Sequence, residues 1–289
     1  MTTVTDGPVP ATTEFLRQQL RPRPRTGEVA LITGGTQGIG KEVARALVRA
    51  GVTTVIAARG AETGGAAATE LSAQAAPDAR AVFQPVDLAD AGSIAGLAEF
   101  VSGEFGRLDI LVNDAARAFP PQSAFTVTAD QMRAVFEVNV FAVVTLTNAL
   151  MPLLEAAEAG RIVNVSTERG SLGVGETPVA DDMRRRAGNT APAGTMAHRI
   201  AFVTPPNMTY GSSKAALNAV TQHFAHQLEQ TGSRVRINAA APGHCATPFN
   251  NFRGWRTAGE GARIITALAL CGDDAPQGGF FNDQGPTVL

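Results

Sequence analysis

Short runs of consecutive apolar residues alternate with longer segments of mixed polarity from Glu28 onward. Apolar runs of about four to eight residues are typical of parallel strands that are buried on both faces. They predict strands at residues 29–32, 54–58, 81–86, 109–113, 161–166 and 235–238. The segments between them predict helices at residues 39–50, 62–75, 93–104, 130–157, 212–230 and 259–270. This alternation indicates an α/β fold with a doubly wound parallel sheet in a single domain.

Two segments depart from the alternation. Residues 1–26 are rich in threonine and proline and end in alternating arginine and proline, which disfavours a helix and favours an extended chain. We interpret them as a flexible N-terminal arm, with a subunit-contact arm as the alternative, and assign residues 27–289 to the domain. Residues 168–209 form a long polar insertion, with a short helix expected at residues 181–186. A loop of this length is usually a functional lid or disordered.

The composition restricts the classes of function. With 44% hydrophobic and 17% charged residues among 289, the chain can bury a sizeable core. A net charge of −2 argues against nucleic acid as the main partner. The apolar stretch 135–154 is interrupted by Glu137, Asn139, Asn148 and Pro152, so we interpret it as a buried helix rather than a membrane span. No signal peptide or cysteine-based metal site is recognised, and we expect a cytoplasmic protein without a metal.

A glycine-rich turn follows the first predicted strand. Glycine at positions 34, 38 and 40 permits the backbone to approach a pyrophosphate, and the amino end of the next helix favours an anion. The turn stands between a buried strand and an amphipathic helix, as in Rossmann-type dinucleotide sites. We therefore expect cofactor contacts from Gly34, Thr36, Gln37, Gly38, Ile39 and Gly40.

The end of the second predicted strand indicates which dinucleotide binds. An acidic residue there would bind the ribose 2′-hydroxyl of NAD, whereas an arginine accommodates the 2′-phosphate of NADP. The chain has Arg59 at this place and no carboxylate before Glu62. This pattern favours NADP(H) as the cofactor.

The only tyrosine of the chain, Tyr210, stands four residues before Lys214, which is one of two lysines. Residues four apart share one face of a helix, so the ammonium group can lie beside the phenol. A neighbouring positive charge lowers the pKa of a phenol and makes it usable for proton transfer near neutral pH. Together with the glycine-rich turn, the pair indicates an oxidoreductase that uses a nicotinamide dinucleotide.

These motifs stand in the order that is typical of the short-chain dehydrogenase/reductase family, which the chain resembles from Gly27 to its C-terminus. The resemblance also rests on the following stretches: Asp87-Leu88, Asn113-Asp114-Ala115-Ala116, Asn139, the strand before Ser166, and Pro242-Gly243 with Thr247. The chain is most similar in appearance to carbonyl reductases, which also carry a long insertion before the tyrosine. In those relatives the insertion obstructs a tetramer contact, so the resemblance implies a monomer or a dimer.

The resemblance implies a role for each matching residue. Asp87 and Leu88 would hold the adenine, Asn113 and Ala115 would line the cofactor ribose, and Pro242, Gly243 and Thr247 would contact the nicotinamide end. Asn139 would anchor a water in a proton relay. Tyr210 would be the general acid and base. Lys214 would bind the nicotinamide ribose and lower the pKa of the tyrosine.

Two departures from the family pattern affect the chemistry. The usual Asn-Asn-Ala-Gly motif contains Asp114 and Ala116, which add a carboxylate and a methyl group close to the cofactor. The serine that usually holds the substrate oxygen is replaced by Thr167, which keeps a hydroxyl donor but crowds the site with its β-branch. Ser166, one residue earlier, is the alternative, although adjacent strand residues face opposite ways.

We therefore expect an NADPH-dependent carbonyl reductase that acts on a ketone or quinone-type small molecule such as a secondary-metabolite intermediate. The insertion would form a wall of the substrate pocket. His244, Phe252 and Trp255 are further candidates for substrate contacts. Two alternatives stay open: a non-redox enzyme such as a cyclase, dehydratase or isomerase on the same scaffold, and a cofactor-binding regulatory protein.

Overall fold

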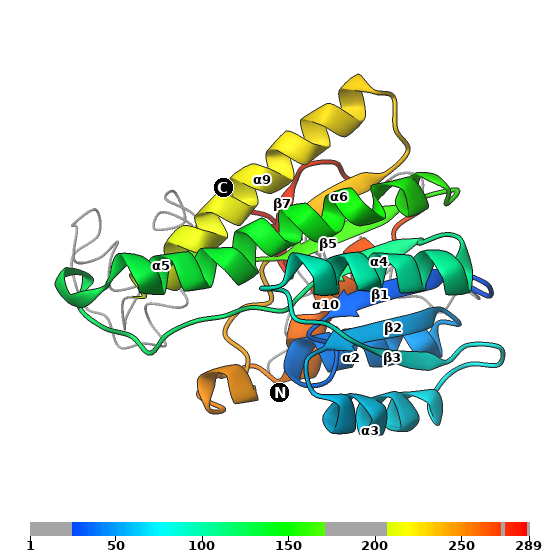
Figure 1. Cartoon of the computed structure of the whole chain (residues 1–289), viewed down its shortest axis with the longest axis horizontal. Helices are drawn as coiled ribbons and strands as arrows, with labels where there is room; N and C mark the ends of the chain where they lie inside the picture. The colour runs from blue at the N-terminus through cyan, green and yellow to red at the C-terminus, as the bar shows by residue number, and fades with distance from the viewer. Residues whose placement is uncertain (1–24, 171–206, 273–274, 288–289) are drawn as a thin grey trace, which may run out of the picture.

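A single eight-stranded sheet forms the centre of the molecule (Figure 1). The structure is a computed structural model that describes residues 25–170, 207–272 and 275–287. The strand order is β3-β2-β1-β4-β5-β6-β7-β8, and all neighbours are parallel except β7 and β8. The strands are β1 (Val29–Thr33), β2 (Thr53–Ala58), β3 (Ala81–Pro85), β4 (Ile110–Asn113), β5 (Arg161–Val165), β6 (Arg236–Ala240), β7 (Phe280–Asn282) and β8 (Gly285–Pro286). The chain reverses its direction of travel across the sheet between β1 and β4, where ligands of such folds usually bind.

Helices pack on both faces of the sheet (Figure 1). One face carries α2 (Gly38–Arg49), α3 (Ala61–Ser72) and α10 (Ala258–Ala269). The other carries α4 (Ala91–Phe105), α6 (Ala142–Glu155) and α9 (Met208–Gln230). Successive residues of β1 point to opposite faces, so Ile32 lies in the first core and Leu31 in the second. The expected α/β single-domain fold is confirmed.

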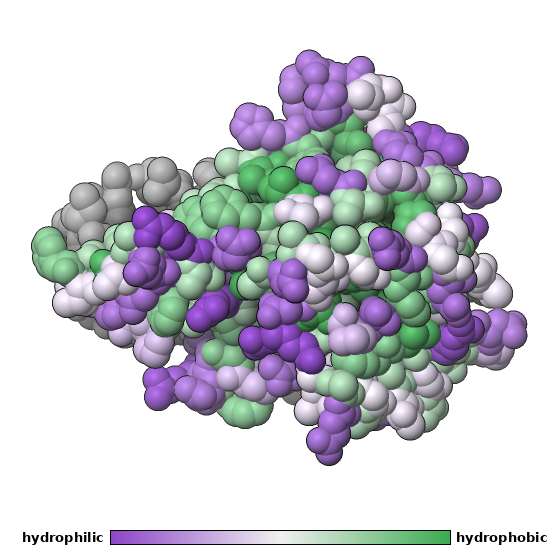
Figure 2. Space-filling view, in the orientation of Figure 1, coloured by the Kyte–Doolittle hydropathy of each residue, from purple (hydrophilic) through white to green (hydrophobic). Residues whose placement is uncertain are grey.

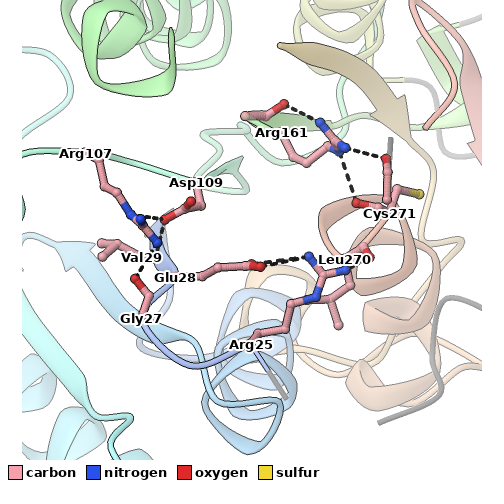
Figure 3. Close-up of polar contacts among 11 residues, drawn as sticks. Arg25, Gly27, Glu28, Val29, Arg107, Asp109, Arg161, Leu270 and Cys271 are labelled. Atoms are coloured by element: carbon pink, nitrogen blue, oxygen red, sulfur yellow. Dashed lines mark hydrogen bonds and ion pairs between the residues drawn. The ribbon is translucent and has the colours of Figure 1, made fainter. Parts of the chain in front are cut away.

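The amino ends of the central strands are held by a group of arginine contacts (Figure 3). The Arg107 guanidinium donates to the Asp109 carboxylate at 3.1 Å and to the carbonyl of Gly27 at 2.7 Å. The same Asp109 carboxylate accepts a hydrogen bond of 2.8 Å from the backbone nitrogen of Val29. This cluster ties the start of β1 to the start of β4.

A second pair of arginines connects the sheet to the end of α10 (Figure 3). Arg25 forms an ion pair with Glu28 at 3.0 Å and donates to the carbonyl of Leu270. Arg161, at the start of β5, donates to the carbonyl of Cys271 at 3.2 Å. Backbone carbonyls that follow a helix have lost their helical partners, and these two guanidinium groups supply donors to them.

The long helix expected at residues 130–157 is divided into three segments. It consists of α5 (Ala129–Phe136), a π-helical turn η2 (Glu137–Phe141) and α6. A π-helical turn contains an extra residue and is frequent at functional sites. This turn contains Asn139, whose side chain makes three hydrogen bonds, to Arg117 in the loop after β4 and to Ser213.

Two further differences concern α9 and the C-terminal strands. The helix expected from residue 212 begins at Met208, because the Asn207 side chain accepts a hydrogen bond of 3.1 Å from the backbone nitrogen of Tyr210 and caps the helix. The strands β7 and β8 were not predicted, since segments of three and two residues carry little periodic signal. The expected helix at residues 181–186 lies outside the described residues, as do residues 1–24 and most of the insertion.

Polar residues are spread over the visible face of the molecule, with apolar residues between them (Figure 2). Among the described residues, one helical stretch, Ala129–Glu155, is long and apolar enough to cross a membrane by length and composition. The buried side chains of α6 within this stretch pack into the second core, and 44% of its most apolar window is buried. The core helix of a globular domain has the same composition, so the stretch is weak evidence for a membrane span.

Candidate active site

The glycine-rich turn after β1 packs against two other loops at the carboxyl edge of the sheet. Gly34 has a φ of +77° and Gly38 a φ of +57°, which L side chains rarely adopt. A Cβ atom at Gly34 would lie 3.1 Å from the backbone of Ala115, and one at Gly38 would lie 3.4 Å from Thr247. The turn also exposes Gln37 and leads directly into the amino end of α2. The structure thus brings three sequence-predicted cofactor segments together, since Pro242 and Gly243 begin the same loop as Thr247.

Buried amides connect this edge to α9. The Asn113 side chain donates to Asn164 at 2.8 Å, and Asn164 donates to the Thr221 hydroxyl at 2.9 Å. The side-chain oxygen of Asn113 is buried and has no partner in the described part of the chain. A buried acceptor without a donor is costly, so this atom is suited to accept a hydrogen bond from a bound ligand.

The opposite end of the same edge carries the residues expected near the adenosine. Arg59 follows β2 directly and its side chain is exposed, with no ion pair among the described residues. Asp87 follows β3, and its carboxylate accepts a hydrogen bond of 3.0 Å from the backbone nitrogen of Ala89, which fixes the loop that contains Leu88. A cationic group and a fixed carboxylate therefore lie beyond the ends of two adjacent strands.

Tyr210 and Lys214 lie in the first two turns of α9, on one face of the helix. The Lys214 ammonium is buried, lies 5.7 Å from the centre of the Tyr210 ring, and donates to the carbonyl of Val165 at 2.6 Å. That carbonyl belongs to the last residue of β5. The hydrogen bond holds the ammonium at the carboxyl edge of the sheet, close to the phenol.

Asn139 links the loop after β4 to the same part of α9. Its side-chain oxygen accepts from the backbone nitrogen of Arg117 at 2.8 Å, and its nitrogen donates to the carbonyl of Arg117 and to the Ser213 hydroxyl, both at 3.0 Å. Ser213 in turn donates to the carbonyl of Tyr210 at 2.7 Å. Asn139 therefore positions the first turn of the helix that carries the tyrosine.

The two candidate hydroxyls after β5 have different surroundings. Ser166 is buried, and its hydroxyl donates to the carbonyl of Lys214 at 3.4 Å. Thr167 is only partly buried, and its hydroxyl accepts from the backbone nitrogen of Arg169 at 3.4 Å, which leaves its proton free to donate. This arrangement favours Thr167 over Ser166 as the group that binds a substrate oxygen.

The charges of the site interact with one another. Burial raises the pKa of Asp114 to about 7, although Lys214 and a backbone hydrogen bond from Gly40 oppose this shift. Burial lowers the pKa of Lys214 to about 8, and Asp114 opposes that shift. The pKa of Tyr210 is raised, first by burial and then by Asp114, while Arg169 opposes the shift. The sequence-based expectation of a lowered tyrosine pKa is therefore wrong for this arrangement, because burial and Asp114 outweigh the opposing effect of Arg169.

Sequence reasoning missed two residues of the site. Arg169 lies in the turn after β5, and its backbone carbonyl lies 3.4 Å from the position of a Cβ atom at Gly211, the residue after Tyr210. The Phe249 ring lies 5.7 Å from the Tyr210 ring and is half exposed. The signal for Arg169 was its place two residues after Thr167, at the carboxyl end of a strand. Trp255, which was a candidate, packs against His244 with 4.9 Å between the ring centres and an angle of 57° between the ring planes.

The assembled edge fits a dinucleotide. The two glycines with positive φ leave a backbone cradle beside Thr247, Asn113 offers an unused buried acceptor, and Arg59 offers a cation at the adenosine end. By contrast, no group of three or more side chains suited to a metal ion occurs within residues 25–170, 207–272 and 275–287.

Comparison with known proteins identifies relatives over most of the chain. The family model described as short chain dehydrogenase matches residues 28–179 and 196–256. The short-chain dehydrogenase anuI of Penicillium roqueforti is 32% identical over 91% of this chain and 97% of its own length. Carbonyl reductase (NADPH) 3 of Homo sapiens is 31% identical, over 89% and 96%. Among solved structures, the complex of RhlG with NADP from Pseudomonas aeruginosa has a TM-score of 0.70 and 26% identity, over 90% and 95% of the two chains.

Proposed function

This chain belongs to the short-chain dehydrogenase family, and on that premise we propose that it is an NADPH-dependent reductase of a ketone or quinone-type carbonyl in a small molecule. One observation carries the proposal. The phenol of Tyr210 and the buried ammonium of Lys214 share one face of α9, at the edge of the sheet where the glycine-rich turn lies. Proton transfer to a carbonyl oxygen requires such a positioned acid.

The residues of the site supply the proton and the hydrogen bonds to the substrate oxygen, whereas the cofactor supplies the hydride. NADPH, when bound, supplies a hydride to the carbonyl carbon. The Tyr210 phenol keeps its proton at neutral pH because its pKa is raised, and it donates this proton to the carbonyl oxygen. The Thr167 hydroxyl donates a hydrogen bond to the same oxygen. Lys214 stabilises the phenolate that results, and its own pKa of about 8 allows it to release or take up a proton near neutral pH.

The choice of NADPH over NADH rests on Arg59. Its exposed guanidinium at the carboxyl end of β2 has no partner among the described residues and can accept the 2′-phosphate of NADP. Two findings from relatives agree with this choice: the human relative carries NADPH in its name, and the Pseudomonas aeruginosa structure is a complex with NADP.

Asp114 favours a second candidate function. A carboxyl group with a pKa of about 7 beside the active-site lysine could serve as a second acid or base, as an isomerase or dehydratase requires. In that case the cofactor would bind without being consumed. The intact pair of Tyr210 and Lys214 makes the reductase the better supported function.

Nucleotide titration followed by turnover assays would test the proposal. Purified protein is titrated with NADPH and with NADH. Consumption of NADPH in the presence of each of a panel of ketones and quinones is then followed by the absorbance of the reduced nicotinamide, at about 340 nm. We expect tighter binding of NADPH and consumption that depends on the added carbonyl. Tight binding with no carbonyl-dependent consumption in wild-type protein would favour the non-redox function.

A further inference from the structure

Asp114 and Ala115 pack against both ends of the glycine-rich turn. A Cβ atom at Gly34 would lie 3.1 Å from the backbone of Ala115, and one at Gly40 would lie 2.6 Å from the Asp114 carboxyl. The backbone nitrogen of Ala115 also donates to the hydroxyl of Thr33, the last residue of β1, at 3.2 Å. These contacts place the loop after β4 against the backbone that would hold the pyrophosphate of the cofactor.

Two backbone groups of the turn lie next to the Asp114 carboxyl. One is the backbone N–H of Gly40, which donates a hydrogen bond to it. The other is the carbonyl of Gly34. Its oxygen lies 2.7 Å from the position of a Cβ atom at Gly40, and the oxygen of Asp114 lies 2.6 Å from the same position. One side chain therefore faces a backbone donor and a backbone acceptor, and it satisfies both only if it has an acceptor and a donor of its own.

Only the neutral form of Asp114 matches both backbone groups. A neutral carboxyl group has an O–H donor beside an acceptor oxygen, whereas a carboxylate has acceptors alone. The carboxylate would therefore face the carbonyl of Gly34 without a proton between the two oxygens, which is unfavourable away from water. Asparagine, the usual residue of the family at this position, offers a donor and an acceptor whatever the pH. Neutral Asp114 thus reproduces the hydrogen-bonding pattern of the amide, and the carboxylate does not.

The ionisable groups that interact with Asp114 in the described part of the chain lie on α9. Burial raises the pKa of Asp114 to about 7, and Lys214 opposes the shift. Tyr210 is the second such group, since Asp114 contributes to its raised pKa. On α2, the ammonium of Lys41 is directed away, because it forms an ion pair of 2.6 Å with Glu70 on α3. Both forms of Asp114 are therefore populated near neutral pH.

We propose that Asp114 is a positioning residue for the dinucleotide: its neutral form holds Gly34 and Gly40 in the arrangement that binds the cofactor phosphates, and its carboxylate form does not. The proposal rests on the proposed use of a nicotinamide dinucleotide. The neutral carboxyl accepts from the N–H of Gly40 and donates to the carbonyl of Gly34. Phosphate groups at the amino end of α2 repel a nearby carboxylate, which favours the neutral form further. Binding of the dinucleotide therefore takes up a proton.

A role of Asp114 in the chemistry itself makes a different prediction. As the acid or base of a non-redox reaction, Asp114 would act on the substrate. The variant Asp114→Asn would then lose turnover and keep the nucleotide affinity of the wild-type protein, together with its pH dependence. As a positioning residue, Asp114 is replaced well by asparagine, which supplies a donor and an acceptor at every pH. In that case Asp114→Asn keeps tight nucleotide binding and loses the pH dependence.

The test measures the dissociation constants of NADPH and NADH between about pH 6 and about pH 8, the range over which a group with a pKa near 7 titrates. We expect both constants to rise by about tenfold over this range in wild-type protein, as one proton requires. Asp114→Asn should bind tightly at every pH, and Asp114→Ala weakly at every pH. Asp78→Asn, which removes an exposed carboxylate, is the control and should keep the wild-type profile. The 2′-phosphate of NADPH titrates near pH 6, but NADH lacks this group, so the effect of Asp114 is the one that both nucleotides share.

Calorimetry counts the proton without any turnover. The heat of NADPH binding near neutral pH, in buffers of different ionisation enthalpy, gives the number of protons taken up. We expect up to one proton more in wild-type protein than in Asp114→Asn, whereas a proton taken up by Lys214 would appear in both. Equal uptake and equal pH profiles in the two proteins would refute the positioning role and leave the reductase function standing. If the wild-type protein binds with this pH dependence but reduces no carbonyl, the reductase function fails while the role of Asp114 stands. If neither nucleotide binds the wild-type protein, both proposals are refuted.

Discussion

The carboxyl group of Asp114 and the ammonium group of Lys214 interact inside the active site, and each favours the charged form of the other against the effect of burial. Asp114 also lies against the glycine-rich turn, since a Cβ atom at Gly40 would lie 2.6 Å from its carboxyl oxygen. The family pattern has asparagine at this position. The chain therefore carries a titratable group at a place where the usual amide neither gains nor loses a proton near neutral pH.

Asp114 should make the stability of the nucleotide-free protein depend on pH. Its pKa is 3.8 before folding and about 7 in the structure, so the native state retains a proton that the unfolded state loses between these values. The free energy of unfolding should fall as pH rises from about 4 to 7, by at most about 1.4 kcal/mol per pH unit. Urea denaturation of Asp114→Asn should show a smaller slope. Asp78→Asn, which removes an exposed carboxylate, is the control and should keep the wild-type slope.

Tyr210→Phe should abolish carbonyl reduction and leave the affinity for NADPH nearly intact. The variant removes the proton donor but keeps the ring that contacts Phe249. Loss of general acid catalysis typically costs about 10²–10⁴-fold in rate. Steady-state kinetics and nucleotide titration measure the two effects separately. A variant that retained most of the activity would show that another group protonates the substrate.

Arg59→Asp should weaken binding of NADPH much more than binding of NADH. The change replaces a cation at the end of β2 with a carboxylate, which repels the 2′-phosphate and can accept a hydrogen bond from a 2′-hydroxyl. A charge-assisted contact of this kind is worth about 1.5–3 kcal/mol, so we expect at least a tenfold change in the ratio of the two dissociation constants. An equal effect on both nucleotides would remove Arg59 from the explanation of cofactor choice.

Catalytic activity should depend on the hydroxyl of Thr167 and not on its methyl group. Thr167→Ser keeps the donor and should retain or increase activity, because it removes the crowding of the β-branch. Thr167→Val keeps the shape and removes the donor, which should reduce kcat by about 10²-fold or more. The same pair of substitutions should leave NADPH affinity unchanged. Equal activity of the serine and valine variants would refute the proposed contact with the substrate oxygen.

Gly40→Ala should destabilise the protein, whereas Gly65→Ala should not. A methyl group at Gly40 would lie 2.6 Å from the Asp114 carboxyl and 2.7 Å from the carbonyl of Gly34, so the backbone must shift at a typical cost of about 1–3 kcal/mol. Gly65 lies in α3 with open space around it, and alanine there should stabilise the helix by about 0.5–1 kcal/mol. Thermal denaturation of both variants provides the comparison.

The sequence was sufficient for strands β1 to β6 and for the positions of Tyr210 and Lys214, because buried strands and an i, i+4 pair depend on local patterns. It was insufficient for the π-helical turn at Asn139, whose side chain bonds to Arg117 and Ser213, residues 22 and 74 positions away. The predicted direction of the Tyr210 pKa shift was wrong for a similar reason. The expected effect of Lys214 is local, whereas burial and the carboxylate of Asp114 follow only from the folded arrangement.

The arginine contacts at the amino ends of the strands have a consequence for alkaline solution. A guanidinium does not lose its proton in proteins, so Arg107 and Arg161 keep their hydrogen bonds as pH rises. Lys214, at the other end of the same strands, loses its charge at about pH 8. Mild alkali should therefore abolish the activity of this protein while the arginine contacts at the amino ends of the strands persist. The activity should return when the pH is lowered.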